Sequence, residues 1–220
     1  MGVKKSLSAA LAAVVLAVSA VAAHAVTYNF TGVTSNSTAN VTTGQTQLTM
    51  DVLDSGSGTV SFTFNNSGPL ASSITDVYWD DQASLLGTMG AITSSSGVSF
   101  SQGANPGNLP GGNTIGFTVS PSGASADSNA PAQPNGVNPG EWLTIVWNLI
   151  SGATFADVIA ALNLGGDQSG SLRVGIHVQG FANGGSESFV NTPPVPLPAA
   201  GWLMVAGLGA LTIARRRRTA

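Results

Sequence analysis

The sequence predicts an all-β fold: an antiparallel, jelly-roll-like β-sandwich with one short helix, placed between two apolar terminal segments. The central residues are rich in Ser, Thr, Gly and Asn and carry frequent turn signals. Several short stretches alternate apolar and polar residues with the period of a strand, and only one has the spacing of an amphipathic helix. We therefore divide the chain into residues 1–25, 26–192 and 193–220, with a single β-domain in the middle, because a segment of that length can bury one hydrophobic core.

Two segments, 141–150 and 171–181, show the clearest strand alternation. The residues expected on their core faces are Leu143, Ile145, Trp147 and Leu149 in the first segment and Leu172, Val174, Ile176 and Val178 in the second. Arg173, His177 and Gln179 fall on the other face of the second segment, which we expect to face outwards. The remaining predicted features are short strands at 60–64 and, in part, at 115–119, and long loops at 101–113 and 121–140.

The single predicted helix spans residues 154–162. Its apolar positions follow the i, i+3, i+4, i+7 spacing of one helix face and are Phe155, Val158, Ile159 and Leu162. Thr154 is a suitable N-cap, and Asp157 lies in the first turn, where a carboxylate is favourable. Gly165 and Gly166 can end the helix, which we expect to close one end of the sandwich.

The charges are distributed unevenly along the chain. Of seven Lys and Arg residues, only Arg173 lies within residues 26–192, whereas all ten Asp and Glu lie there, which gives this segment a formal charge of −9. Such a surface repels phosphate backbones, so we exclude nucleic acid as a partner. There is no cysteine, which excludes disulfides and thiolate metal sites.

The N-terminal residues have the three parts of a secretion signal. Lys4 and Lys5 precede an apolar run over residues 7–21, and Ala23 and Ala25 stand at small-x-small cleavage positions. This pattern predicts export by the Sec machinery with cleavage after Ala25. The alternative is an uncleaved anchor helix.

The C-terminal residues predict a membrane segment. A proline-rich stretch at 193–198 leads into sixteen uncharged residues at 199–214, and four arginines follow directly, namely Arg215, Arg216, Arg217 and Arg218. Sixteen helical residues reach about 24 Å, against a hydrocarbon thickness of about 30 Å, so the span is short. The arginine side chains can reach the headgroups and hold this end in the cytoplasm, with the β-domain outside the inner membrane.

The start of this segment carries a recognisable motif, formed by Val195, Pro196, Leu197, Pro198 and Ala199. Together with the apolar stretch and the arginine tail, it resembles the VPLPA variant of the PEP-CTERM sorting tag, found on exported proteins of Gram-negative bacteria. The resemblance covers about 26 residues. It implies that an exosortase processes the inner-membrane precursor near the Pro motif. The protein would then reach the cell surface or the extracellular matrix.

Two other interpretations of this tail stay open. Residues 197–201 resemble the Leu-Pro-x-Thr-Gly signal of Gram-positive sortases, with Ala200 in place of Thr. Alternatively, the segment is a permanent single-span anchor that is never processed. Leu197 also stands where the parent Pro-Glu-Pro motif has its acidic residue, so the identity of the processing enzyme is open.

One acidic and aromatic stretch of the β-domain is a candidate ligand site. It contains Asp76, Tyr78, Trp79, Asp80 and Asp81. In a strand, Asp76 and Asp80 share a face with Tyr78, while Asp81 shares the other face with Trp79. Their carboxylates are candidate ligands for Ca²⁺, the only cofactor that the sequence suggests. The alternative is that these acids lie at a strand end and prevent edge pairing.

These observations favour a protein without catalytic activity, exported to the cell surface or matrix, with a structural or interaction role. Tyr78, Trp79 and Trp142 could stack on sugars, so the alternative function is a calcium-assisted module that binds extracellular polysaccharide. A secreted hydrolase is the third hypothesis. It requires a cleft that brings together two carboxylates, or His177 with a serine, and no nucleophile-elbow motif is present.

Overall fold

The structure is a computed structural model that describes residues 25–193 of the chain. The predicted signal segment, the Pro motif at 195–199 and the arginine tail at 215–218 lie outside these residues, so the hypotheses about them stay predictions. No helix within the described residues is long and apolar enough to span a membrane.

The elements are, in chain order, β1 (Val26–Gly32), α1 (Thr38–Gln47), β2 (Leu48–Gly56), β3 (Thr59–Asn66), β4 (Ser73–Asp81), β5 (Leu86–Ser94), β6 (Phe100–Gln102), a 3₁₀ helix (Gly112–Ile115), β7 (Ser125–Ser128), α2 (Ala132–Asn135), β8 (Trp142–Leu149), α3 (Phe155–Leu164), β9 (Leu172–Gln179) and β10 (Glu187–Thr192).

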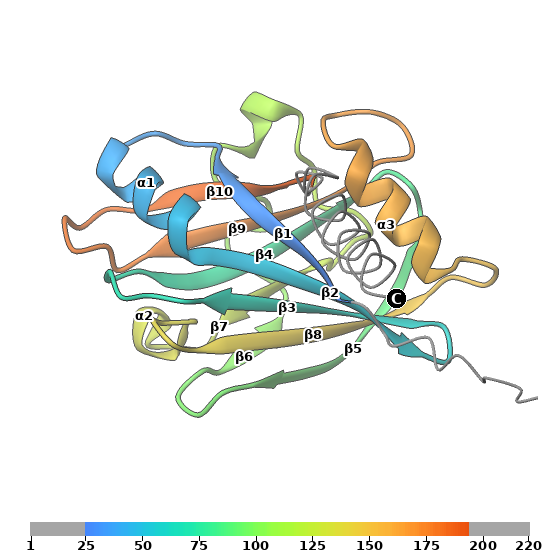
Figure 1. Cartoon of the computed structure of the whole chain (residues 1–220), viewed down its shortest axis with the longest axis horizontal. Coiled ribbons are helices and arrows are strands. Elements are labelled where there is room, and N and C mark those ends of the chain that lie inside the picture. The colour runs from blue at the N-terminus through green and yellow to red at the C-terminus, as the bar shows by residue number, and fades with distance from the viewer. Residues whose placement is uncertain (1–24, 194–220) are drawn as a thin grey trace, which may run out of the picture.

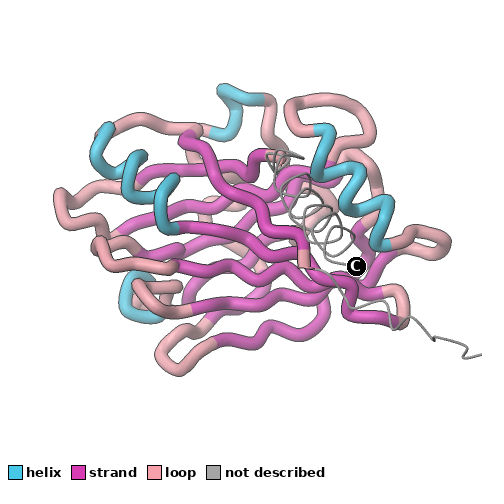
Figure 2. The backbone as a smooth tube through the Cα atoms, viewed as in Figure 1, coloured by secondary structure: helices cyan, strands magenta, loops and turns pink. Residues whose placement is uncertain are grey.

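The ten strands form one antiparallel sheet in the order β5-β8-β3-β2-β1-β10-β9-β4-β7-β6. The strands at the two ends of this order, β5 and β6, approach each other, so the sheet is nearly closed. Figures 1 and 2 show α3 at one end of the sheet and α1 and α2 towards the opposite end. The predicted all-β antiparallel class is confirmed, in the form of one continuous sheet.

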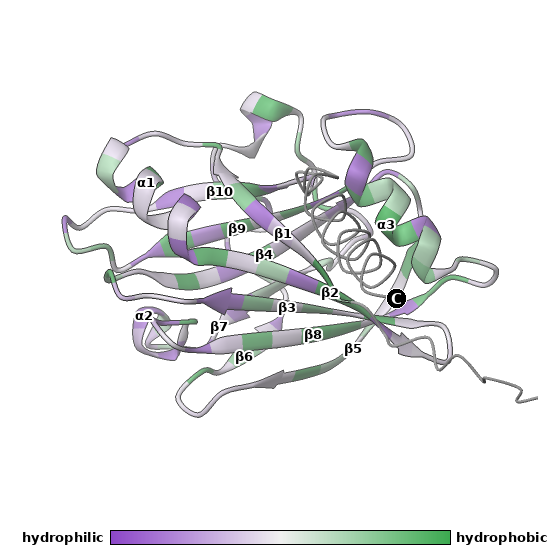
Figure 3. Cartoon of the chain, in the orientation of Figure 1, coloured by the Kyte–Doolittle hydropathy of each residue, from purple (hydrophilic) through white to green (hydrophobic). Residues whose placement is uncertain are grey.

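The core lies between opposite walls of this curled sheet. Trp79 of β4 packs edge-on against Phe62 and Phe64 of β3, with ring centroids 5.7 and 5.9 Å apart, and against Trp147 of β8 at 5.3 Å. Because β4 is not a neighbour of β3 or β8 in the sheet, these rings join strands that no ladder of hydrogen bonds connects. Figure 3 shows the alternation of apolar and polar residues along β3 and β8.

The clearest strand predictions are confirmed. Strands β8, β9 and β3 coincide with the predicted segments, and the expected core side chains of β8 and β9 are buried, apart from Leu149, which is partly buried. The partial strand expected at 115–119 is wrong. Gly111 and Gly116 adopt φ angles of 72° and 63°, which a strand does not allow, and the 3₁₀ helix forms between them. The expected loops also contain the short elements β6, β7 and α2.

The predicted helix is confirmed as α3. The Thr154 hydroxyl accepts a hydrogen bond from the Asp157 N–H at 3.3 Å, and the Asp157 carboxylate accepts one from the Thr154 N–H at 2.9 Å. This reciprocal capping box satisfies backbone donors that the first turn otherwise leaves free. Val158 and Leu162 are buried in the main core, and Gly165 follows the last turn with φ 59°.

The expectation of a single helix is wrong, because α1 and the one-turn α2 also form. No apolar stripe along α1 could reveal it from the sequence. Instead, the buried Glu187 of β10 accepts a hydrogen bond from the Ser37 N–H at 2.6 Å, just before the helix begins. Gly44 lets the helix lie against the ring of Phe189, since a Cβ there would come within 2.2 Å of a ring carbon.

Residues 103–121, which we call the outer strap, cross the outer face of β4 and β9. Leu109 and Phe117 of the strap form a small second core with Tyr78. They lie directly above Gly175, where an added Cβ would come within 2.8 Å of a Leu109 methyl group. The close approach of the strap to the sheet therefore depends on a glycine at this position.

Arg173 fastens the outer strap to the sheet. Its guanidinium donates hydrogen bonds to the carbonyl oxygens of Ile115 and Gly116 at 2.7 and 2.8 Å, forms an ion pair with Asp80, and lies 5.3 Å from the centroid of the Phe117 ring. The expectation that Arg173 faces solvent is wrong, because the strap covers it and leaves only 3 % exposed. It is the one Lys or Arg of the described part of the chain.

The two ends of the described chain lie side by side. β1 and β10 are antiparallel neighbours, with Asn29 opposite Thr192, so β1 begins where β10 ends. Pro193 then lies beside the C-terminus of α3, with a ring carbon 3.4 Å from the position of a Cβ on Gly165. The segments before β1 and after β10 therefore leave the sheet at the end that carries α3.

The ion pair of Arg173 gives a stability prediction. Arg173→Met should lower the free energy of unfolding by about 3–5 kcal/mol, because it leaves Asp80 buried without a cation and two strap carbonyls without donors. Urea unfolding measures the change, and limited proteolysis should detect new cleavage within residues 103–121. The matched control is Asp167→Asn, which removes the partner of Arg173 whose side chain is 52 % exposed and should cost less than about 1 kcal/mol. An Arg173→Met protein as stable as this control would contradict the assignment.

Candidate functional site

The structure does not bring the carboxylates of the acidic stretch together as a calcium site. β4 is buried along its whole length, and each carboxylate has a different partner. Asp76 contacts His177, Asp80 pairs with Arg173, and Asp81 accepts hydrogen bonds from the backbone of the following turn. Among the residues that the structure describes, no group of three or more His, Cys, Asp or Glu side chains is placed to hold a metal ion.

The faces of β4 are those predicted, but the strand is internal. Asp81 points to the opposite face from Asp80 and accepts the N–H groups of Leu85 and Leu86 at 2.8 and 2.7 Å. Burial raises the pKa of Asp81, although these backbone donors act in the opposite direction. Since β4 lies between β9 and β7, the idea that these acids prevent edge pairing is also wrong.

The aromatic residues do not form a sugar platform. Tyr78 and Trp79 are fully buried on opposite faces of β4, and Trp147 is in the core, as expected. Trp142 is 39 % exposed, but it lies at the start of β8 rather than beside the other two. Stacking on a sugar needs an exposed ring face, so Tyr78 and Trp79 cannot supply one.

A row of three ionisable side chains crosses neighbouring strands. Asp127 of β7 lies opposite Asp76 of β4, which in turn lies opposite His177 of β9. A bulge in β4 inserts Thr75 next to Asp76, and its hydroxyl donates to the Asp76 carboxylate at 2.9 Å. The His177 Nδ1 is 3.0 Å from the same carboxylate oxygen. The sheet therefore gathers two carboxylates and an imidazole on one face.

This row lines a polar hollow of about 290 Å³. Asn105 and Pro106 of the outer strap form one wall, and Gln179 and residues near α2 form the rest. The side chain of His177 is only 11 % exposed, so the expectation of an exposed histidine on the outer face is wrong. The strap and α2 cover this part of the outer face, and the polar hollow is the opening that remains between them.

Asp76 and Asp127 are adjacent carboxylates in the polar hollow, and this affects the pKa values of their neighbours. Burial and the adjacent charge of Asp76 raise the pKa of Asp127, while backbone hydrogen bonds from Asn105 and Ser128 oppose the change. Burial, and then the charges of Asp76 and Asp127, also raise the pKa of Tyr78, which lies next along the same face of β4. The donors of Arg173 are directed at Asp80 and the strap, so they do not neutralise this pair.

The arrangement can accept hydrogen bonds and exchange protons. A carboxylate only accepts, so Nδ1 of His177 carries the hydrogen towards Asp76. Asp127 lies directly opposite Asp76 on neighbouring strands, so the two carboxyls are adjacent on one face of the sheet. A glycosidase instead holds its carboxyls about 5–9.5 Å apart, around the sugar. Within residues 25–193, the His177 ring forms no hydrogen bond to a serine hydroxyl.

The sequence could show only part of this site. The sequence indicates Asp76 as a candidate ligand and His177 as a candidate partner of a serine, but Asp127 lies in a segment of Pro, Ser and Asn that predicts a loop. The pattern of β7, Ser125–Ser128, has no apolar alternation to mark it as a strand. No protein-family model, curated protein or solved structure matches the chain.

The raised pKa of Asp127 gives a pH-dependent prediction. Because the folded protein binds this proton more tightly than the unfolded chain, the resulting stability is present below about pH 4 and is lost as the pH rises through the raised pKa. Asp127→Asn removes that loss. The melting temperature of the variant minus that of the wild type should therefore increase from pH 4 to pH 7.

Asp157 provides a control of opposite sign, since hydrogen bonds from Thr154 lower its pKa. Its contribution is present above the ordinary pKa and is lost as the pH falls. For Asp157→Asn the difference in melting temperature should decrease from about pH 2 to pH 4 and stay nearly constant from pH 4 to pH 7. Equal trends for the two variants would show that Asp127 is not the strained member of an acidic pair.

Proposed function

We propose that this chain is an exported protein of the cell surface or extracellular matrix of a Gram-negative bacterium, with a structural or interaction role. In this proposal the Sec machinery exports it, residues 199–214 hold the precursor in the inner membrane, and an exosortase processes it near residues 195–199. The delivered body is a jelly-roll-like β-sandwich without catalytic activity, placed in a polysaccharide-rich layer such as a biofilm matrix.

The order of the C-terminal residues carries this proposal: a Pro motif, an uncharged stretch of sixteen residues and four arginines. It is supported by the position of the last strand, because β10 ends at Thr192, directly before the proline-rich stretch. The folded body therefore does not need residues of the motif to complete its sheet. A protease would find the motif at the end of the domain rather than within it.

The distribution of charge also supports the proposal. The only Lys or Arg of the described part is buried in the ion pair with Asp80, so its exposed formal charges are all negative. Arginine clusters next to a membrane segment stay on the cytoplasmic side, so the arginine tail would leave the β-domain on the other side of the membrane. Both flanking segments leave at the α3 end of the sheet, so one side of the domain can face the membrane during delivery.

The processing step is tested on the mature C-terminus. Intact-mass spectrometry of the protein, from cells with and without the membrane processing enzyme, should show loss of the arginine tail only when the enzyme is present. Pro196→Ala combined with Pro198→Ala should prevent the cut, whereas Pro194→Ala, outside the motif, should not. A chain that ends at Ala220 in both strains would refute processing.

A second candidate function is the binding of a neutral, polyhydroxylated ligand in the polar hollow. The observation that favours it is the cluster of acceptors formed by Asp76, Asp127 and His177, with the amides of Asn105 and Gln179 beside it. The hollow is at the lower end of ligand-pocket sizes, which favours one sugar unit or a chain end over a long polysaccharide groove. This binding does not involve calcium.

The imidazole of His177 reports on such binding by NMR. Titration with a panel of monosaccharides should shift the His177 ring signals, and Asp76→Asn should weaken the binding about tenfold, as expected for one hydrogen bond to a charged group. Trp142→Ala and the addition of EDTA should leave the affinity unchanged. The same affinity in Asp76→Asn, or loss of binding with EDTA, would rule out this site.

A further inference from the structure

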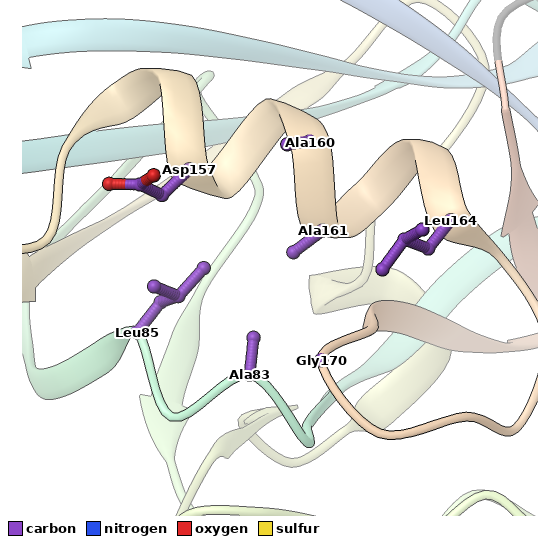
Figure 4. Close-up of a pocket in the computed structure, with 7 residues that line it drawn as sticks. All are labelled: Ala83, Leu85, Asp157, Ala160, Ala161, Leu164 and Gly170. Carbon is purple, nitrogen blue, oxygen red and sulfur yellow. The ribbon is translucent and has the colours of Figure 1, made fainter.

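An apolar groove runs along one side of α3 (Figure 4). We call it the α3 groove; its volume is about 290 Å³. The residues that line it are Asp157, Ala160, Ala161 and Leu164 of α3, and Ala83, Leu85 and Gly170 on the opposite side. The four helix residues have the spacing of a single stripe, which lies beside the stripe of Val158 and Leu162 that faces the core. Figure 4 shows Ala83 and Leu85 pointing towards this stripe, with Asp157 and Leu164 at opposite ends.

Large apolar side chains remain exposed around this groove. Leu164 is 52 % exposed, and Ile150, whose N–H donates to the Leu85 carbonyl at 3.0 Å, is 43 % exposed. The two other large exposed hydrophobic residues of the described part, Leu70 and Trp142, lie elsewhere. Apolar surface gathered in one place is typical of a binding surface.

The chain leaves the described part beside this groove. Pro193 lies against Gly165, the residue that follows Leu164. The next residues, 194–198, contain three prolines, and six steps of extended polyproline backbone from 193 to 199 cover up to about 19 Å. Residue 199 can therefore reach the Leu164 end of the α3 groove without any change in the sheet.

The uncharged stretch that follows is longer than the groove and matches it in residue size. Asp157 and Leu164 are about 10 Å apart along the helix, and sixteen helical residues span about 24 Å, so about 14 Å of the stretch extends beyond Leu164 when its end is level with Asp157. The floor of the groove is made mostly of alanine and glycine, and the stretch itself carries Gly207 and Gly209, so two helices could approach closely.

The charges at the far end of the groove are complementary to those of the tail. With residue 199 about 14 Å beyond Leu164, within reach of the proline-rich linker, a segment that runs towards the start of α3 brings Arg215 to the end that carries Asp157. Asp54 lines a neighbouring hollow with Thr154 and Phe155 at the same end of the helix. Two carboxylates therefore lie where the four arginines would arrive.

We infer that residues 199–214 dock into the α3 groove of their own domain whenever they are outside a membrane. Docking covers the apolar stretch and the exposed Leu164 together, so the exported chain does not aggregate before insertion. The tail leaves the groove when a bilayer offers it more apolar contact. This goes beyond sorting and processing, because it needs no exosortase.

Disulfide trapping tests the docking in the full chain, which has no native cysteine. One cysteine is introduced as Leu164→Cys and a second at each position from 203 to 209 in turn, in protein held in dilute solution without detergent. Intramolecular disulfides should form with a helical period of three to four positions, because one face of the tail lies against the groove. Micelles of dodecyl maltoside should lower the yield by competing for the tail.

The matched control is Leu70→Cys, since Leu70 is 54 % exposed against 52 % for Leu164. A tail that is only tethered samples its surroundings at an effective concentration set by the linker and gives no helical period. The Leu164 series should exceed the Leu70 series at least tenfold. Ala160→Glu, which puts a carboxylate at an exposed groove position, should abolish the difference without disturbing the core.

Three results would overturn the docking. These are equal yields in both series, a yield without helical period, and disulfides mainly between molecules, which would assign the groove to a second copy of the chain. None of them bears on processing, since no enzyme takes part in this experiment. The mass-spectrometric test of the C-terminus has an outcome that is independent of these results.

Discussion

The architecture around the candidate site depends on the buried ion pair between Arg173 and Asp80. This pair alone would contribute little, because the desolvation of two charges offsets their attraction. Its importance comes from the other donors of the guanidinium, which satisfy two carbonyls of the outer strap and fix it over β4 and β9. The strap then covers Tyr78 and supplies Asn105 as a wall of the polar hollow. Arg173, the one Lys or Arg of the described residues, thus orders the longest irregular segment of the domain, the outer strap.

The sequence predicts the parts of the fold in which apolar and polar residues alternate along a strand or an apolar stripe follows a helix. β8 and β9 show this alternation, and α3 shows the helical spacing together with its Thr154 cap. β4 does not, because both of its faces are covered: the core on one side and the strap on the other. Asp80 and Asp76 are partnered by residues 93 and 101 positions away, and no local pattern records such pairs.

The sequence predicts only part of the candidate site. His177 lies on a strand that the alternation identifies, whereas Asp76 lies on β4, which it does not, and each is visible as an unusual polar residue. Their contact depends on register, which the bulge at Thr75 shifts by one residue, and Asp127 joins them from a short strand without an apolar side chain pattern. The sequence therefore shows which residues carry ionisable groups, but only the order of the strands in the sheet brings them together.

The α3 groove and the polar hollow lie towards opposite ends of the sheet. Because the chain leaves the domain at only one of these ends, the two hollows differ in their position relative to the proposed membrane contact. The α3 groove is at the end where the chain leaves the domain, while the polar hollow lies beside α2, towards the other end (Figure 1). In a precursor held by its tail, the proposed membrane contact is on the α3 side, so the polar hollow faces away from the bilayer. A ligand of the matrix could then reach Asp76 and Asp127 before the tail is cut, and binding and sorting need not compete for the same surface.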